Sequence, residues 1–484
     1  METTGFSMLL MMLFSFGTAN ELLDFMHTPS YWQLHDTPMT VERMIAEFDA
    51  PAVVDTEEIP KWIAALGADH FRMRKDASKA LQEIGEPARP FLEAASTSED
   101  PEISSRARSL LASLPSRQPS TAIRRLMAVR TLGELKDPKG LAVLESLLDS
   151  NEPFLADFAR LAAQRIEGKP HEHVPLKHNP ADLALLPSNT AALGQMVVPG
   201  DPDWHVEKLF EHMPMFGAVE GQADMLAEMT EAVGLAAEQL GNVRLDALTL
   251  GFTENIARGD GAMILIAHGK WDVRKMTAGL KQMAPDWPQQ NVDDQTVIVI
   301  ESNVRLIAFD DATLAFVAAT DEAGQMVRKL IQAKKQPVDL ALDAGLIQEL
   351  SGMDRAQPTW LIADLKKAAP DLDGPFKSLE HLSLTTRSVD QKSILHFTVR
   401  GRPGATVALV QEVLQGKVKE MIAQVEQGAT FLPKGEQTIK MLKSLKLERG
   451  AQGLSGQFEL DKQAGTSLFM PLLMFGRMPL QQLE

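Results

Sequence analysis

Three histidines stand close together in the stretch KPHEHVPLKHNP. In an extended chain His171 and His173 point to the same side, and with His178 they could offer three imidazoles to zinc or copper. Prolines recur every five residues through the stretch, which is typical of an extended, solvated connector with no rigid element to orient the rings. We therefore predict a polar linker over residues 169–187, and a metal site is the alternative.

Four other histidines have ordinary structural explanations. His205 and His212 share one face of a predicted helix, but they lack the glutamate of an HExxH zinc site. His268 and His396 lie in corresponding predicted strands, and we expect them to be ordinary positions on a sheet.

Paired carboxylates occur at Asp310–Asp311, Asp293–Asp294 and Asp371 with Asp373. The first pair falls at a predicted hairpin turn, where aspartate is favoured. The third resembles the start of a calcium loop, but Leu382 stands where such a loop needs its closing carboxylate. The sequence also lacks the G-x-S-x-G, Walker A and G-x-G-x-x-G motifs. We therefore predict no catalytic, cofactor-binding or metal-binding residues, and a protein that is not an enzyme.

The composition excludes further classes of function. The 484-residue chain is long enough for several domains and carries a formal net charge of −17. A field of that sign repels phosphate backbones, so nucleic-acid binding is not expected. Cysteine is absent, which excludes disulfides, thiolate nucleophiles and cysteine-ligated metals.

The N-terminal segment contains a short apolar run, Met8–Phe16, which cannot span a bilayer. Gly17 and Ala19 place small residues at the −3 and −1 positions of a cleavage site. We predict a signal peptide over residues 1–19, and with it export to the periplasm or cell envelope, although Glu2 replaces the usual basic residues. The alternatives are a buried or interfacial helix and a cytoplasmic location. No transmembrane span is predicted.

Residues 60–168 carry the pattern Ala-x3-apolar-x2-apolar four times. This spacing places three residues on one helical stripe, with a small side chain where helices approach closely. Aspartate followed by proline, at Asp100 and Asp137, is typical of helix starts. The alanines that open the pattern are Ala77, Ala107, Ala128 and Ala159. We predict helices near 70–84, 87–96, 101–114, 121–135, 138–149 and 153–167.

These stripes resemble the HEAT-repeat family over about 100 residues, as a three-helix unit used twice at an offset of 51 residues. The resemblance implies a helical solenoid that contacts other proteins. So short an array has open ends. We expect the next domain to cap one end, and a helix predicted at 41–49, within the acidic segment 20–59, to cap the other.

From residue 188 short β runs alternate with helices, and the order of elements recurs. The motif LDALTL near residue 245 is followed 134 residues later by LEHLSL. Each half has the order strand, helix, two strands, helix, hairpin, which is typical of an antiparallel sheet covered on one face by helices. The predicted strands are 190–198, 244–252, 261–269, 295–302, 304–311 and 313–319, then 359–367, 379–386, 394–401 and a hairpin at 445–460.

We therefore predict an α+β multidomain chain, with a short HEAT-like solenoid followed by a duplicated α+β region with units 188–340 and 341–484. Two unrelated α+β domains are the alternative. This order of parts resembles exported bacterial proteins of unknown function, a likeness that implies little about activity.

These features favour a scaffold that binds a partner protein through the surface of its helical repeats. The first alternative is a small-molecule or lipid-binding protein with a pocket between the two α+β units, because interfaces between domains favour pockets. An enzyme of unrecognised class is the remaining alternative. An exposed apolar or aromatic patch on the helices would favour protein binding. No oligomeric state is predicted.

Overall fold

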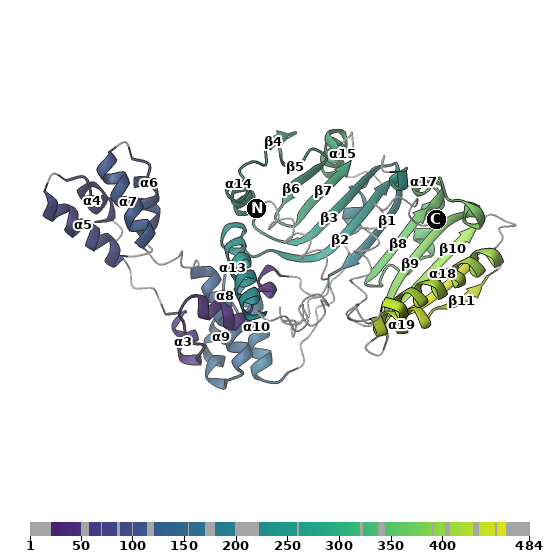
Figure 1. Ribbon diagram of the computed structural model, residues 1–484, viewed down its shortest axis with the longest axis horizontal. Coiled ribbons are helices and arrows are strands. Elements are labelled where there is room, and N and C mark those ends of the chain that lie inside the picture. Colours follow the sequence, from purple (N-terminus) through teal and green to yellow (C-terminus); the bar gives the residue numbers. More distant parts are fainter. Residues whose placement is uncertain are drawn as a thin grey trace. The chain divides into compact units, whose positions relative to one another are not determined.

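A computed structural model of the chain shows a helical part and a sheet with helices (Figure 1). The chain divides into a helical unit, Tyr31–His171, and a sheet unit made of residues up to Ser30 and from Glu172 onward. The structure describes residues 21–49, 58–68, 70–84, 88–98, 100–113, 121–152, 154–169, 180–198, 222–258, 261–319, 323–336, 344–389, 392–401, 407–428, 435–450 and 453–460.

All the helices predicted from the alanine stripes are present in the helical unit. Asp100 begins one of them by accepting hydrogen bonds from the backbone N–H groups of Glu102 and Ile103, at 2.8 and 3.2 Å. Asp137 accepts one from Lys139 at 2.9 Å. The elements are α5 (Phe71–Ile84), α6 (Arg89–Ala95), α7 (Pro101–Ser113), α8 (Thr121–Leu135), η4 (Pro138–Gly140), α9 (Leu141–Ser146) and α10 (Leu155–Ile166).

Small residues mark the helix contacts, as the stripes predict. The four alanines that open the pattern are fully buried. Helices α8 and α10 approach so closely at Gly133 that a Cβ atom there would lie 2.9 Å from Cα of Ala162. The packing of the described helices therefore follows the predicted stripes, and their assignment as HEAT-like repeats stays a prediction.

Three further helices precede this set: α2 (Thr28–Leu34), α3 (Val41–Ala46) and α4 (Ile59–Ala65). The sequence predicts a loop at TPSYW, and this prediction is wrong, because Tyr31 and Trp32 are buried on a helix. Helix α3 packs against α8, where the guanidinium of Arg124 donates to both carboxylate oxygens of Glu47 at 2.9 and 2.5 Å.

The described strands of the sheet unit form one antiparallel sheet of twelve strands. Their order is β11-β12-β10-β9-β8-β1-β2-β3-β7-β6-β5-β4. The α+β prediction is therefore confirmed. The first half contributes β1 (Thr190–Val197), β2 (Arg244–Thr253), β3 (Ala262–Lys270), β4 (Gln289–Val292), β5 (Gln295–Glu301), β6 (Val304–Asp310) and β7 (Thr313–Ala319). The second half contributes β8 (Thr359–Asp364), β9 (Leu379–Val389), β10 (Lys392–Gly401), β11 (Lys446–Arg449) and β12 (Gly453–Leu460).

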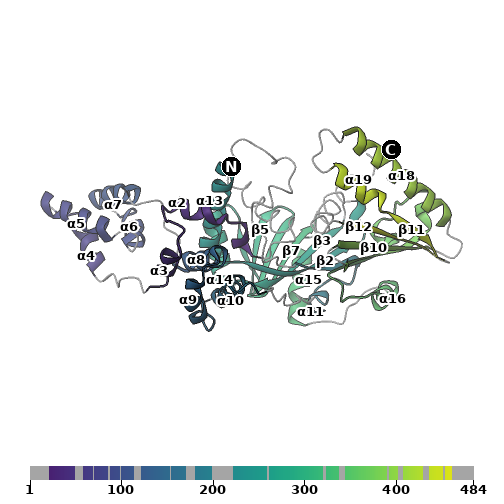
Figure 2. The ribbon, with the colours of Figure 1, turned by 90° about the horizontal axis from the view of Figure 1, so that it is seen from below.

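The prediction of helices on one face of the sheet is wrong, because they cover both. Figure 2 shows α18 and α19 on one side of the sheet and α15 and α16 on the other. The core under α15 contains Ile264 and Val317, whereas the core under α18 contains Val399 and Leu454. The helical elements are η1 (Leu22–Phe25), α11 (Pro180–Leu183), α13 (Gln222–Leu240), η6 (Ile256–Arg258), α14 (Val273–Met283), α15 (Ala323–Lys335), α16 (Ala344–Gly352), α17 (Leu365–Ala368), η7 (Gly374–Ser378), α18 (Val407–Gly428) and α19 (Gly435–Lys443).

The two halves meet at the centre of the sheet, where Gly194 of β1 lies opposite Leu361 of β8. The strand order runs outward from this join as β1, β2, β3, β7, β6 in one direction, with β5 and β4 beyond them, and as β8, β9, β10, β12, β11 in the other. Both second strands carry a register shift, at Asp246 in β2 and at Glu380 in β9, 134 residues apart. Because bulges are inherited features of a strand, the shared topology and bulge support duplication, with the two sheets joined into one.

Candidate functional site

The connector histidines His171, His173 and His178 lie outside the described residues, as do His205 and His212. Within the described ranges, no three His, Asp or Glu side chains are grouped as metal ligands. A metal site in the connector therefore stays the alternative to a polar linker.

The predicted carboxylate pairs lie in turns and loops. Asp311, between β6 and β7, accepts a hydrogen bond from the backbone N–H of Val273 at 2.8 Å. Asp293 and Asp294 form the two-residue turn between β4 and β5, with φ values of 49° and 69°. Both carboxylate oxygens of Asp371 bind Arg258, at 2.6 and 2.5 Å. Each pair therefore has a local structural role.

A buried acid lies where α11 meets the sheet. Asp182 exposes only 3% of its surface. Burial raises the pKa of Asp182 to about 6; His268 and Lys334 oppose the rise, and Asp310 adds to it. The ammonium of Lys334 lies 2.9 Å from Oδ2 of Asp310. A carboxyl group that titrates near neutral pH is suited to acid–base chemistry, which makes this cluster the candidate for an active site.

The surroundings of the acid favour a structural role. Leu183, Leu185 and Leu186, in the same segment as Asp182, are buried in the core beneath α15. Thr313, which accepts a hydrogen bond from Lys334 at 3.2 Å, is also buried. Asp182 therefore faces packed protein, and its raised pKa reflects this packing.

The second half carries an acid at the equivalent position. Glu349 on α16 follows Asp182 by 167 residues, the same offset that relates Gly194 of β1 to Leu361 of β8. Both acids are buried and each is followed by leucine. The only sequence signal for this equivalence is the pair Asp-Leu and Glu-Leu, which is too short to find without the strand register.

The bases that face these acids are also equivalent. His268 follows Leu265 of β3 by three residues, and Arg400 follows Phe397 of β10 by three residues. When paired residues are followed from strand to strand outward from the join, Leu265 and Phe397 are reached at the same step in the two halves. The guanidinium of Arg400 donates to Oε1 of Glu349 at 2.8 Å. Each half therefore has an acid ahead of its first strand and a base at the matching position of its third strand, and in the second half the two form an ion pair.

The halves differ on the sheet face that α15 covers in the first half. Where the first half buries Ile264, Ile266 and Ala315, the second half has His396, Thr398 and Ser455. His268 and His396 thus lie in corresponding strands, as predicted, but at different positions within them. On β10 and β12 this face of the second half is therefore polar, whereas on β8 it buries Trp360 and Ile362.

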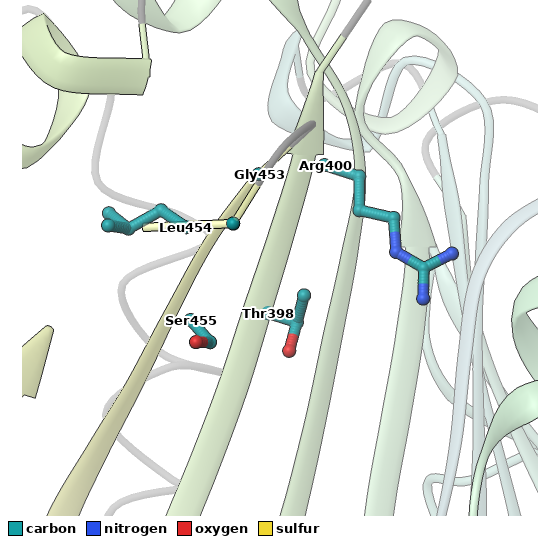
Figure 3. Close-up of a pocket in the computed structure, with 6 residues that line it drawn as sticks. Thr398, Arg400, Gly453, Leu454 and Ser455 are labelled. Carbon is teal, nitrogen blue, oxygen red and sulfur yellow. The ribbon is translucent and has the colours of Figure 1, made fainter. Parts of the chain in front are cut away.

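A shallow depression of about 230 Å³ lies on this polar face, lined by Thr398, Arg400, Gly450, Gly453, Leu454 and Ser455. Sites for drug-sized ligands usually enclose roughly 300–1,000 Å³. Figure 3 shows the side chain of Arg400 directed away from Thr398 and Ser455, because it binds Glu349. The depression is therefore too small and too poorly lined with convergent groups to be a strong ligand site.

Helix α5 exposes large apolar side chains at its start. Phe71 and Met73 expose 66% and 51% of their surfaces, more than any other large apolar residue in the described chain. The guanidinium of Arg74 lies 6.0 Å from the centroid of the Phe71 ring and donates to the carbonyl of Ala68 at 2.8 Å. The exposed ring is therefore held beside an anchored cation.

Exposed basic residues continue along the same helix. Arg72, Lys75 and Lys79 follow at helical spacing, and all three are exposed. We name these exposed residues of α5, Phe71, Arg72, Met73, Lys75 and Lys79, the α5 patch; the exposed acid Asp76 lies among them, 4.0 Å from Arg72.

A second apolar surface lies at the join of the halves, on the sheet face opposite α15. Leu250 and Leu384 are buried there, and half-buried side chains from both halves pack against them. These side chains are Phe252, Leu265, Leu361 and Leu395.

No protein-family model matches the chain, and no curated protein matches its sequence. Solved structures that resemble part of it include two crystal forms of TP0453. Form III is 11% identical with a TM-score of 0.35, covering 59% of this chain and 96% of that chain. Form I is 10% identical with a TM-score of 0.33, covering 61% and 98%. Likeness at this level carries no argument about function.

None of the described helices has the length and hydrophobicity that a bilayer crossing requires.

Proposed function

We propose that this chain is a non-enzymatic interaction protein that binds a partner protein through the α5 patch of its HEAT-like helical unit. The observation that supports the proposal is the exposure of Phe71 and Met73 within three residues of each other. Single exposed apolar side chains are normal on protein surfaces. An aromatic residue, methionine and arginine together have the composition of an interface centre.

The charge of the α5 patch indicates the chemistry of the partner. Arg72, Lys75 and Lys79 are exposed on a chain whose net charge is −17. A partner with an apolar pocket rimmed by acidic side chains would match both the apolar and the basic part of the patch.

The edges of the sheet are poor alternatives for binding. The edge strands β4 and β11 have four residues each, and β11 carries Lys446, Glu448 and Arg449. Short, charged edge strands discourage the addition of a further strand.

Substitution of the two apolar anchors tests the proposal. The double variant Phe71→Ala with Met73→Ala should weaken partner binding at least about 30-fold, because truncation of an interface anchor costs about 2 kcal/mol or more. Cross-linking with mass spectrometry in the native cell identifies the partner, and titration of the purified pair measures its affinity.

Ile347→Ala is the matched control. Ile347 exposes 46% of its surface on α16 of the sheet unit, close to the exposure of Met73. The control should bind like the wild type. Equal binding by the double variant, or recovery of a bound small molecule and no partner, would contradict the proposal.

The proposal includes export, on the basis of the apolar run Met8–Phe16 and the small residues that follow it. N-terminal sequencing of the protein from its native cell tests this part. An intact Met1 would exclude cleavage after Ala19.

The apolar surface at the join supports a second candidate, a protein that binds a lipid or another apolar small molecule. Its half-buried residues come from both halves, which is where the alternative function places its ligand. Mass spectrometry of the organic extract of the purified protein should detect a stoichiometric apolar molecule. Leu395→Gln should reduce the amount of bound apolar molecule about tenfold or more, because the glutamine amide would lose its hydrogen bonds to water when the ligand covers it.

A further inference from the structure

We propose that the apolar segment 467–478, SLFMPLLMFGRM, docks on the apolar surface at the join of the two halves. The segment lies outside the described residues and follows β12, which ends at Leu460. The inference is independent of binding through the α5 patch. It places a part of the chain itself on the surface where the second candidate function places an apolar molecule, so the two would compete for one site.

The surface crosses the centre of the sheet as one row of paired residues. From β3 to β9 the row contains Leu265, Leu250, Gly194, Leu361 and Leu384. All members of the apolar cluster at the join come from strands, and four of them are only partly buried. The surface therefore presents apolar atoms whose burial by a covering segment would be favourable.

The strand that leads into the segment contributes to the same face. Phe458 of β12 pairs with Leu395 of β10, a member of the cluster at the join, and the ring centroids of Phe458 and Phe397 are 6.0 Å apart. Leu454, also on β12, is buried beneath α18. Because alternate residues of a strand share one face, β12 directs Leu454 and Phe458 to the side of the sheet on which the surface lies. The segment therefore leaves β12 beside the surface.

The chain after β12 is long enough to cover the join. In the strand order β8 lies three strands from β12, which is about 14 Å at the usual spacing of strands. When extended, residues 461–466 reach about 20 Å. Residues 467–478 span about 18 Å as a helix, and more as a strand. The segment can therefore lie over β9, β8 and β1, where Leu384, Leu361 and Gly194 form the floor.

The duplication provides a reason for this segment rather than another. In the first half the chain after β7 forms α15, which covers the sheet through apolar side chains at positions i, i+1, i+4 and i+5: Met326, Val327, Leu330 and Ile331. In the second half the chain after β12 has the same spacing, at Leu468, Phe469, Leu472 and Leu473. By the order of elements, the segment is the counterpart of a helix that covers the sheet.

The face that α15 covers in the first half does not suit the segment in the second half. On that face β10 and β12 present His396, Thr398 and Ser455, and His396 is exposed. Apolar side chains packed on these groups would remove their hydrogen bonds to water. The opposite face carries the apolar surface at the join, so we expect the covering segment to change faces between the two halves.

Disulfide formation in the full chain tests the docking, because the chain has no cysteine of its own. Leu395 and His396 are adjacent on β10 and therefore face opposite sides of the sheet. In dilute protein under mild oxidation, Leu395→Cys with Phe469→Cys should form its disulfide at least about tenfold faster than His396→Cys with Phe469→Cys, since the bond needs Cα atoms within about 7 Å. Leu472→Cys in place of Phe469→Cys repeats the comparison at a second position of the segment.

Maleimide labelling of single-cysteine variants gives an independent measurement. The labelling rate of Leu395→Cys should rise about tenfold when Phe469→Ser and Leu472→Ser are added, because the docked segment shields the thiol. The labelling rate of His396→Cys should be the same with and without the serine substitutions.

The proposal is overturned if disulfides to Leu395→Cys form no faster than disulfides to His396→Cys at both positions of the segment, or if the disulfide joins two chains. It is also overturned if the serine substitutions leave the labelling rate of Leu395→Cys unchanged. Equal rates of disulfide formation together with a stoichiometric apolar molecule in the organic extract would assign the surface to the second candidate function instead.

Discussion

Replacement of Trp32 by alanine is expected to lower the free energy of unfolding of the helical unit by about 3–5 kcal/mol, as for other fully buried aromatic residues. Trp32 is completely buried where α2 meets α8. Its indole N–H donates to Oγ1 of Thr131 at 2.7 Å, and the guanidinium of Arg124 lies 5.4 Å from its ring centroid. Hydrogen exchange of the α8 amides measures the loss, because it reports on the helical unit within the intact chain.

Trp32→Phe separates packing from hydrogen bonding. Phenylalanine keeps an aromatic ring beneath Arg124 but cannot donate to Thr131, so about 1–2 kcal/mol should be lost. Amides of the sheet unit serve as the internal reference, and their protection should not change in either variant. A loss below about 1 kcal/mol in Trp32→Ala would contradict the burial of the indole.

The helices of the helical unit could be predicted because their signals are local. Ala77 and Ala128 open stripes whose spacing matches the helical period, and Asp100 and Asp137 each precede a proline. The structure buries the alanines and uses both aspartates as caps. Local spacing was therefore sufficient for these elements.

Helix α2 could not be predicted in the same way. Thr28 and Pro29 in TPSYW suit a loop as well as a helix start. The contact that decides between them is long-range, because Trp32 binds Thr131, 99 residues later. Local propensity is a weak guide where tertiary packing determines the conformation.

The strands were predictable, but the join between the halves was not. β-branched and apolar runs indicate each strand, and the repeated motif at 245 and 379 indicates the duplication. The pairing of Gly194 with Leu361 brings together residues 167 apart, and no local pattern specifies which edges of two units will pair.

The candidate sites are defined by which side chains are buried and which are exposed. The type of a residue does not by itself determine whether its side chain is buried. Phe71 and Met73 have the residue types of a core, yet they are exposed, whereas Asp182 has the type of a surface residue and is buried. An apolar residue on a predicted helix indicates a buried face only in the average case. The α5 patch and the buried acids were therefore absent from the predicted sites.

Replacement of Gly194 by valine is expected to lower the free energy of unfolding of the sheet unit by about 3 kcal/mol, through overpacking of a closed core position. A Cβ atom at Gly194 would lie 2.6 Å from the carbonyl oxygen of Trp360 and 3.1 Å from Cβ of Leu361. Both atoms belong to β8, so the strands that join the halves would have to move apart. The free energy follows from urea unfolding of the full chain, with exchange of β1 and β8 amides locating the change.

Strand propensity alone predicts that Gly194→Val would raise the free energy of unfolding, because valine is favoured over glycine in strands by about 1 kcal/mol. Gly416→Ala is the control: Gly416 is exposed within α18, and an added Cβ would meet nothing within 4 Å. Alanine there should stabilise the chain by about 0.5–1 kcal/mol. Since both changes add carbon to a glycine of the same unit, opposite signs would identify the close approach of β1 and β8 as the cause. A Gly194→Val chain as stable as the wild type would show that the halves are not packed together at this position.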